Sequence, residues 1–355
     1  MNRIDTELGR ALKGKIRSQG ALTFRDFMSA ALYDEVLGFY TTGPKIGSPD
    51  GPFHTNARFP AFGYAIAQAI NHAEKAIGFP LLVLELGGGT GQLGKNIMSC
   101  LQTTHEYAVL DPSHGLRANQ TKRGLHAIKN FDSLTPRPTF VFGNEVLDAL
   151  PVHRVMGMGH DEVVELYVDL DEDGEFCEQP RPLSTVALAD RLKGERIKLG
   201  RGQVAEICLE LIPLLQSIRK VVEPGYVVFV DYGDSASNLY SHRYRNGTLR
   251  SYYQQQQIYD PFFAVGYQDL TADVDYTAVC FIAEEMGFEV EGPIPQGTWL
   301  RHLGIHGYMG STGNRESDQE EIDVLTRPAG LGSTFDVLIF KTSGLPDGPG
   351  LQPSS

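Results

Sequence analysis

The sequence has only four cysteines, and they lack the spacing seen in zinc sites or disulfide frameworks. They stand at positions 100, 177, 208 and 280 and form no Cys-x-x-Cys pair. No apolar run approaches the roughly 20 residues of a membrane span, and Met1–Glu7 carries acids where a signal peptide has an apolar core. These absences predict a soluble protein of a reducing compartment, which is the cytoplasm or, in a eukaryotic source, the mitochondrial matrix.

Basic residues are in the minority. Lys and Arg total 31 against 44 Asp and Glu, which gives a formal net charge of −13. No basic block stands out from this acidic background, so we expect neither a nucleic-acid partner nor a membrane partner. A basic protein substrate fits the charge, and the sequence leaves a homodimer open.

Several catalytic motifs are also missing. The chain has no Gly-x-Ser-x-Gly elbow and no phosphate loop ending in Gly-Lys-Ser or Gly-Lys-Thr, which argues against the commonest hydrolases and phosphate-transferring enzymes. His302 and His306 have the i, i+4 spacing of zinc ligands but no acid between them and no evident third ligand. We therefore expect no metal.

The strongest positive signal is an apolar run that ends in an acid and three alternating glycines. These residues are Glu85, Gly87, Gly89 and Gly91. Glycine permits positive φ and lets backbone N–H groups approach a ligand closely. We predict that the four residues bind S-adenosylmethionine, whose sulfonium and amino groups carry the positive charge that a neighbouring carboxylate attracts.

Two other interpretations of this turn remain open. Gly89-x-Gly91-x-x-Gly94 also fits the dinucleotide fingerprint, which would make the chain a nicotinamide-dependent dehydrogenase. However, Glu85 would repel a pyrophosphate, and the glycines begin at Gly87, directly after the predicted strand. The third interpretation is an ordinary glycine-rich structural turn.

A second predicted strand, 106–111, ends in Asp111. An acid about 20 residues beyond the glycine turn is the usual partner of ribose hydroxyls, so Asp111 is the predicted ribose ligand. Alternatively, Asp111 only opens the turn Asp-Pro-Ser or caps the next helix. Only the first interpretation predicts that Asp111→Ala loses cofactor binding.

A third predicted strand, within 138–151, is followed by Asn144, Glu145 and Asp148. Ligands of open parallel sheets lie beyond the carboxyl ends of the strands. We predict that Asn144 contacts the adenine or methionine part of the donor, and that Glu145 and Asp148 are catalytic, binding a cationic nucleophile or accepting its protons. The structural alternative is a helix cap with acids in its first turn.

The pattern along the chain predicts an α/β protein with a helical N-terminus and inserted segments. Helices are expected over 203–222 and 269–287, and 41–60 is either a lid or a surface connection. Asp231 and Tyr232, after a further buried strand, are secondary substrate candidates. The predicted segments are an N-terminal helical and lid segment (1–60), the first part of the core (61–151), an antiparallel β insertion (152–202), core (203–233), an inserted excursion (234–268), core (269–343) and a flexible tail (344–355).

Several stretches together resemble the MidA-like methyltransferases, a family that includes a mitochondrial complex I assembly factor acting on a protein arginine. The most specific is Asn144-Glu-Val-Leu-Asp-Ala-Leu-Pro-Val-His-Arg154. The other similar stretches, in family order, are 27–33 with 38–40, 85–91, 116–120, 231–233, 247–252, 269–275 and 296–300.

This resemblance implies a doubly wound, Rossmann-like class I methyltransferase sheet and S-adenosylmethionine as the cofactor. It also implies a protein substrate methylated on arginine nitrogen. By position, it assigns the three glycines to the methionine part, Asp111 and Ser113 to the ribose, and Asn144 with Glu145 to the junction of donor and acceptor.

The expected reaction is direct displacement at the sulfonium methyl, in which the enzyme aligns the nucleophile and excludes water. With a guanidinium acceptor, Glu145 and Asp148 would pair with its N–H groups. A small-molecule O- or N-methyltransferase, the dehydrogenase and a non-catalytic assembly factor remain as alternatives.

Overall fold

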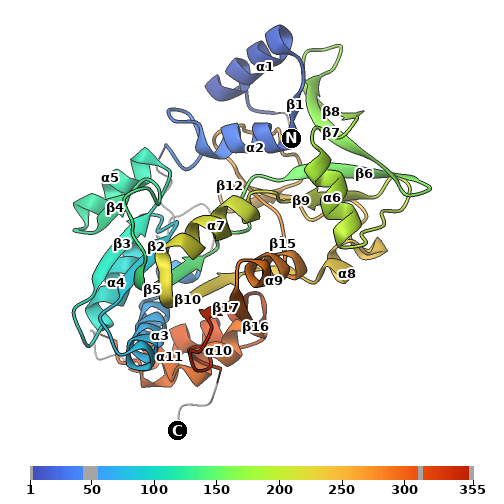
Figure 1. Cartoon of the computed structure of the whole chain (residues 1–355). Helices are drawn as coiled ribbons and strands as arrows, with labels where there is room; N and C mark the ends of the chain where they lie inside the picture. The colour runs from blue at the N-terminus through green and yellow to red at the C-terminus, as the bar shows by residue number, and fades with distance from the viewer. Residues whose placement is uncertain (1–2, 43–54, 311–314, 352–355) are drawn as a thin grey trace. The chain divides into compact units, whose positions relative to one another are not determined.

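The computed structural model describes residues 3–42, 55–310 and 315–351 (Figure 1). The chain forms two compact units, and each gathers three separate stretches of sequence. The first unit draws on Met1–Pro44, Asp148–Ile212 and Gly233–Val279, and the second on Lys45–Leu147, Pro213–Tyr232 and Cys280–Ser355. Segments far apart in the sequence therefore build each unit.

The second unit contains a seven-stranded sheet with the order β16-β17-β10-β5-β2-β3-β4. The five strands from β10 to β4 are parallel, and β17 is antiparallel to both β10 and β16. Strand order reverses between β2 and β5, which is where open α/β sheets bind ligands. The strands are β2 (Leu82–Leu86), β3 (Glu106–Leu110), β4 (His126–Ile128), β5 (Arg137–Asn144), β10 (Val222–Asp231), β16 (Phe288–Pro295) and β17 (Asp336–Thr342).

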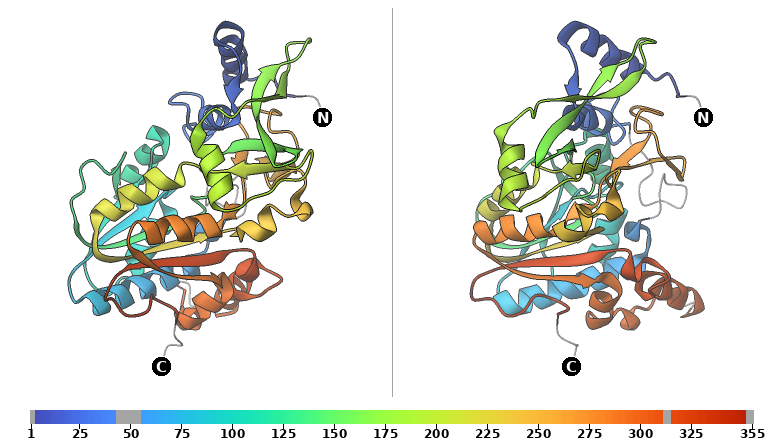
Figure 2. Two further views of the ribbon diagram at one scale, coloured as in Figure 1. Left: turned by 45° about the vertical axis from the view of Figure 1, so that its right-hand side comes forward. Right: turned by 90° about the vertical axis from the view of Figure 1, so that its right-hand side faces the viewer.

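Helices cover this sheet because its central strands are apolar on both faces. Both Val83 and Leu84 of β2 are buried, as are Phe140 and Val141 of β5. Figure 2 shows α3, drawn in blue, on the same side of the sheet as α10 and α11. The helices of this unit are α3 (Pro60–Ile77), α4 (Gln92–Cys100), α5 (His114–Lys122), α10 (Gln296–His302) and α11 (Arg315–Thr326), and α7 (Leu211–Val221) and α9 (Tyr276–Glu285) begin in the first unit and end in the second.

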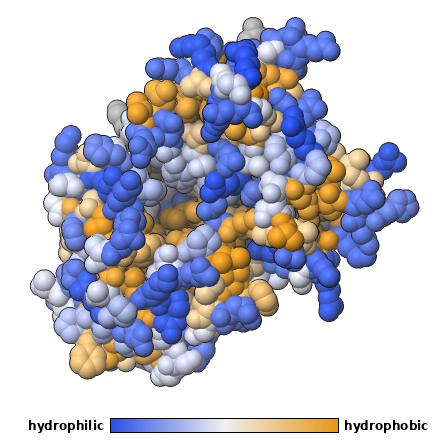
Figure 3. Space-filling model, turned by 45° about the horizontal axis from the view of Figure 1, so that its top comes forward, coloured by the Kyte–Doolittle hydropathy of each residue, from blue (hydrophilic) through white to orange (hydrophobic). Residues whose placement is uncertain are grey.

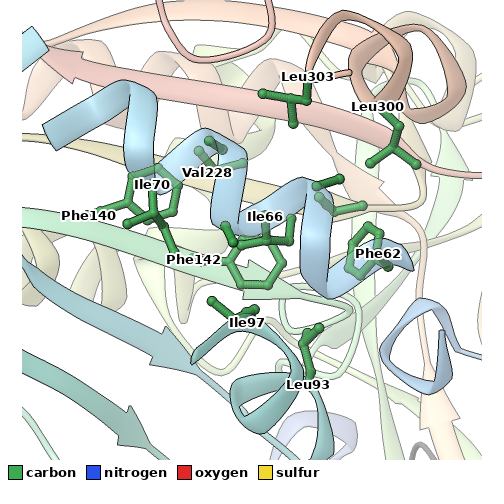
Figure 4. Packing of buried hydrophobic residues seen from close by; sticks show 14 of the residues in the cluster. Phe62, Ile66, Ile70, Leu93, Ile97, Phe140, Phe142, Val228, Leu300 and Leu303 are labelled. Carbon is green, nitrogen blue, oxygen red and sulfur yellow. The ribbon is translucent and has the colours of Figure 1, made fainter. Parts of the chain in front are cut away.

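Helix α3 is the centre of the main core. Pro60 at its first position and Gly78 in the left-handed conformation after its last turn set its limits. Its apolar face carries Phe62, Ile66 and Ile70, which are all 0% exposed. Figure 4 shows these side chains packed against β5 and α4, with Leu300 of α10 and Leu303, the residue after that helix, nearby. This packing fixes the strand ends that carry the predicted site.

The first unit is built around antiparallel strands. Its larger sheet has the order β1-β7-β6-β9, with β8 paired to β7, and a smaller sheet has the order β13-β12-β14. The elements are α1 (Glu7–Gln19), β1 (Leu22–Thr23), α2 (Phe24–Tyr33), β6 (His153–Gly159), β7 (Glu162–Leu170), β8 (Phe176–Arg181), α6 (Val186–Gly194), β9 (Val204–Ile207), β11 (Gly233–Asp234), α8 (Ala236–Leu239), β12 (Arg250–Tyr253), β13 (Gln256–Ile258), β14 (Asp269–Thr271) and β15 (Val274–Asp275).

The helix predicted over 203–222 is wrong at its start, because β9 precedes α7. Val204–Ile207 pairs with β6, and Glu206 in this strand forms an ion pair with Arg154, Oε1 to Nε, at 3.0 Å. These tertiary partners override the helical pattern.

The helix predicted over 269–287 also begins later than expected. Asp269–Thr271 pairs with β12, and the Oδ1 atom of Asp275 accepts the backbone N–H of Ala278. Helix α9 therefore begins at Tyr276, where a side-chain cap satisfies its first turn.

Among the described residues, no helix combines the length and hydrophobicity of a membrane-spanning segment. On the face drawn in Figure 3, hydrophobic residues lie in interrupted patches among hydrophilic ones. Such a mixed surface is normal, since apolar atoms always contribute a large part of a protein's exterior.

Candidate active site

The glycine turn connects β2 to α4 at the switch point of the sheet. Gly87, Gly89 and Gly91 have φ of +62°, +51° and +80°, which L side chains rarely adopt. A Cβ on Gly87 would lie 3.0 Å from Cγ2 of Val146. The turn therefore needs glycine for its conformation and for its close approach to the segment after β5.

Glu85 lies behind this turn, against the first turns of α4. Its carboxylate accepts the Tyr107 hydroxyl at 2.9 Å, and a Cβ on Gly94 of α4 would lie 2.6 Å from its Oε2. The residue is 2% exposed. Burial raises the pKa of Glu85 from 4.5 to about 7, and the nearby Asp111 adds to this increase while the Tyr107 hydrogen bond opposes it.

Asp111 follows β3 and lies beside the same turn. Its Oδ1 accepts the backbone N–H of Ser113, and its Oδ2 accepts Nε2 of Gln120, both at 2.9 Å. The same Nε2 donates to the carbonyl of Gly89 at 2.9 Å. Burial raises the pKa of Asp111 to about 6, against the two hydrogen bonds, which lower it. The hydroxyl of Ser113 accepts the N–H of Leu116 and caps α5.

Asn144 ends β5, and Glu145 follows it with φ of +53°, a strained value for a non-glycine residue. Three donors converge on Oε1 of Glu145: the Thr55 hydroxyl at 2.6 Å, Nδ2 of Asn144 at 2.8 Å and the backbone N–H of Asn56 at 3.3 Å. Nδ2 of Asn56 donates to Gln296 Oε1 at 2.7 Å and to Asn144 Oδ1 at 3.2 Å. The carboxylate of Glu145 is thus held in one orientation.

Asp231 fixes the backbone that follows Glu145. Its Oδ2 accepts the N–H groups of Val146 and Leu147 at 3.0 and 2.8 Å, and its Oδ1 accepts the N–H of Tyr232. The N–H of Glu145 donates to the carbonyl of Val230 at 2.9 Å. Asp231, a secondary substrate candidate, therefore has a structural role as the support of this loop.

Asp148 begins a stretch of the first unit and is 4% exposed. Its carbonyl accepts the N–H of Ala272, next to β14. Its charge contributes to the raised pKa values of Tyr40 and Tyr252, for both of which burial is the larger cause. The Tyr40 hydroxyl donates to Asp269 of β14 at 2.9 Å. Asp148 thus belongs to a group of tyrosine and aspartate side chains.

All the residues predicted for the donor lie in the second unit: the three glycines, Glu85, Asp111, Ser113 and Asn144. Of the two predicted catalytic residues, Glu145 lies in this unit and Asp148 in the first. The prediction that 41–60 is a lid concerns mainly residues 43–54, which lie outside the described residues. At the end of that segment, Thr55 and Asn56 contact Glu145, which the sequence interpretation missed. No local pattern marks them.

Gln120 and Gln296 were also missed as site residues. Both lie within stretches that carry the family resemblance, 116–120 and 296–300, and this was the signal that could have identified them. Both side chains are 0% exposed. Gln120 donates to Asp111, and Gln296 accepts a hydrogen bond from Asn56, which also donates to Asn144.

The residues present fit S-adenosylmethionine. Positive φ values and close packing restrict the turn to glycine, and because glycine has no side chain the backbone of the turn can approach a ligand closely. An acid lies at the end of the neighbouring strand, and Oε1 of Gln120, beside it, is buried without a hydrogen-bond partner among the described residues. Buried acceptors without a partner are uncommon in folded proteins, and this one belongs to the side chain that holds the predicted ribose ligand.

This sheet order, with a glycine turn and a strand-end acid at the switch point, defines the class I fold of S-adenosylmethionine-dependent methyltransferases. Residues 64–294 match the family described as "Putative S-adenosyl-L-methionine-dependent methyltransferase". The chain belongs to this family, as the MidA-like resemblance predicts, and it is an S-adenosylmethionine-dependent methyltransferase.

Three similar proteins support this assignment. The chain is 25% identical to the mitochondrial protein arginine methyltransferase NDUFAF7 homolog of Caenorhabditis elegans over 84% of this chain and 76% of that protein. It is 25% identical to NDUFAF7 of Rattus norvegicus over 93% and 83%. A methyltransferase candidate from Burkholderia thailandensis, solved with S-adenosyl-homocysteine, is 25% identical with a TM-score of 0.85, covering 99% of this chain and 97% of that one.

Proposed function

We propose that this enzyme methylates a nitrogen of an arginine side chain in a protein substrate. The observation that carries the proposal is the strained, triply hydrogen-bonded carboxylate of Glu145 at the switch point. The relatives' names, which call them protein arginine methyltransferases, support the choice of acceptor.

In this proposal the second unit holds the donor. The backbone of Gly87, Gly89 and Gly91 receives the methionine part, and Asp111, positioned by Ser113, receives the ribose hydroxyls. The bound cofactor supplies an electrophilic methyl group. Asn144 lies at the junction, since it ends β5 and donates to Glu145.

Glu145 would bind and orient the acceptor. Its orientation is set before the substrate arrives, because Thr55, Asn56 and Asn144 all donate to Oε1. A carboxylate pairs with a planar guanidinium through charge-assisted hydrogen bonds. It would accept the proton that the attacking nitrogen releases as the methyl group moves from sulfur to nitrogen, which leaves neutral S-adenosyl-homocysteine. An orientation that is fixed in advance reduces the entropic cost of alignment.

Glu85 would act through the turn and not by direct contact. Its carboxylate faces Tyr107 and α4, so its charge favours a cationic donor from behind the glycines.

Within the first unit, Asp148 belongs to a group of carboxylates and tyrosine rings whose chemistry suits a cationic side chain, and its catalytic role remains a prediction. The nearby rings of Tyr33 and Tyr40 are stacked, with centroids 5.4 Å apart, and Tyr40 is bound to Asp269. Aromatic faces and carboxylates together attract guanidinium groups. Tyr33, Tyr40, Asp148 and Asp269 all belong to the first unit.

The test is methyl transfer from labelled S-adenosylmethionine to a cell extract of the source organism, followed by acid hydrolysis and amino-acid analysis. Labelled methylarginine in the protein fraction supports the proposal. Label only in the small-molecule fraction would support the alternative, a small-molecule O- or N-methyltransferase, and would overturn the protein substrate.

Two variants test the role of Glu145. Glu145→Gln should reduce transfer by about 100-fold or more while S-adenosyl-homocysteine still binds. Glu145→Asn should also lose transfer and should lower stability, because its shorter side chain withdraws the acceptor of three donors, a loss that outweighs the easier positive φ of asparagine. Glu291→Gln is the matched control, since Glu291 on the edge strand β16 is likewise a carboxylate held by more than one donor, Lys341 and the N–H of Gly348. Full activity of Glu145→Gln would disprove the role.

A further inference from the structure

Gln120 lies near the end of α5, between two parts of the proposed donor site. We infer that Gln120 is a positioning residue, whose amide group fixes the glycine turn and the Asp111 carboxylate relative to each other. This inference rests on the proposal that Gly89 and Asp111 hold the donor.

The contacts of the Gln120 amide leave it one orientation. Nε2 lies 2.9 Å from the carbonyl oxygen of Gly89 and 2.9 Å from Oδ2 of Asp111. A carbonyl and a carboxylate can only accept, so both must be reached by the nitrogen, and the two N–H groups are both used. The amide therefore joins the turn after β2 to the residue after β3.

The other end of the same amide supports a functional constraint. Oε1 is buried and has no hydrogen-bond partner among the described residues. An unpaired buried acceptor is unfavourable, so the two hydrogen bonds that the same amide donates must offset its cost. The arrangement is explained when the two donated hydrogen bonds serve the geometry of the ligand site.

The backbone of Gln120 is also held close to the turn. A Cβ on Gly91 would lie 3.3 Å from both Cα and Cγ of Gln120, so the helix packs directly on Gly91. Its carbonyl accepts the N–H groups of Arg123 and Leu125 at the end of α5. The side chain is therefore a short and rigid connection.

Without the Gln120 amide, the carbonyl of Gly89 and the carboxylate of Asp111 would lie close together with no hydrogen-bond donor between them. The turn and Asp111 would then each relax, and the donor would have to reorder them on binding. The expected loss is in donor affinity, whereas the chemical step, which depends on Glu145, should be little changed.

The experiment measures S-adenosyl-homocysteine binding to full-length variants by calorimetry, and donor KM and kcat by methyl transfer. Gln120→Met, which keeps length and removes both donors, should weaken binding by about 10- to 100-fold, with kcat within about threefold. The matched control is Gln268→Met: Gln268 is also 0% exposed, and its Nε2 donates to the carbonyls of Asp260 and Pro261 in the first unit. That control should lose stability but keep donor affinity.

Gln120→Glu gives a signature that a merely structural role would not produce. Above neutral pH, two carboxylates would adjoin and binding should be weak, but one shared proton would restore a hydrogen bond as the pH falls. Affinity of this variant should therefore rise from pH 8 to pH 6. The wild type should show no such rise, because ionised Asp111 is its ribose acceptor.

The outcomes separate this inference from the donor site itself. If Asp111→Ala binds S-adenosyl-homocysteine as the wild type does, the proposed donor site is wrong. If Asp111→Ala loses binding but Gln120→Met and Gln120→Glu bind normally at every pH, the positioning role alone is overturned. Equal losses for Gln120→Met and Gln268→Met would also overturn it, since they would reflect general destabilisation.

Discussion

Replacing Glu85 by glutamine should make the protein more stable, relative to the wild type, at alkaline pH than at acid pH. Burial raises the pKa of Glu85 from 4.5 to about 7, so the folded protein holds a proton that the unfolded chain has released between these values. The free energy of unfolding then falls as the pH rises from 4.5 to 7 and stays lower above it. The pKa of Glu85 differs between the folded and unfolded states, and at about 1.4 kcal/mol for each pKa unit this difference lowers the free energy of unfolding by about 3 kcal/mol at pH 8.

The measurement compares urea unfolding of Glu85→Gln and the wild type at pH 5 and pH 8. Trp299 is the chain's single tryptophan and is 0% exposed within the same unit, so its fluorescence reports unfolding there. The glutamine amide also brings donors that need acceptors, a cost of about 1–3 kcal/mol at both pH values. The change between pH 5 and pH 8 isolates the carboxylate and should be about 2–3 kcal/mol in favour of the variant.

The same substitution should weaken donor binding. Loss of the negative charge behind the turn should reduce S-adenosylmethionine affinity at pH 8 about threefold to tenfold more than that of S-adenosyl-homocysteine, which lacks the sulfonium charge. A variant whose stability, relative to the wild type, is the same at pH 5 and pH 8 would refute the desolvation argument. Equal losses for both ligands would refute the electrostatic role.

Three further substitutions test neighbouring contacts. Gly94→Ala, which would favour an exposed helix by about 1 kcal/mol, should instead lower the urea midpoint, because its Cβ would lie 2.6 Å from Oε2 of Glu85; a higher midpoint contradicts this. Wild-type affinity for S-adenosyl-homocysteine should fall below pH 6, since the pKa of Asp111 is about 6; Asp111→Asn should bind weakly without this pH dependence, and a wild-type-like profile argues against ribose binding. Asp231→Asn should reduce methyl transfer more than donor affinity, because Asp231 holds the loop after Glu145; unchanged kcat is the contrary result.

Local sequence patterns predicted the parts of the site that short-range physics determines. The run that became β2 is apolar because it is buried on both faces, and the glycines after it occupy backbone conformations closed to other residues. Asp111 and Asn144 were predicted as site residues because acids and amides at strand ends are visible in the sequence. The alternation of residues along β2 also implies that Glu85 lies on the same face of the sheet as Val83, which is the face that α4 covers.

The remaining contacts depend on tertiary structure that no periodicity encodes. Asn56 and Gln296 are 240 residues apart and exchange two amide hydrogen bonds. Gln120 reaches Gly89 across 31 residues. The strand β9 was missed for the same reason, since its pairing with β6 outweighs the helical pattern around it.

The conformation of Glu145 shows how the sheet supports the proposed chemistry. A φ of +53° for glutamate costs about 1–3 kcal/mol unless the surroundings enforce it. Strand β10 enforces this conformation through two residues. The carbonyl of Val230 accepts the N–H of Glu145, and the carboxylate of Asp231 accepts the N–H groups of Val146 and Leu147. Since β10 is paired in register with β5 up to Asn144, the strain can relax only if strand pairing or the Asp231 contacts are lost. The rigidity of the sheet is therefore what keeps the carboxylate oriented when no substrate is bound.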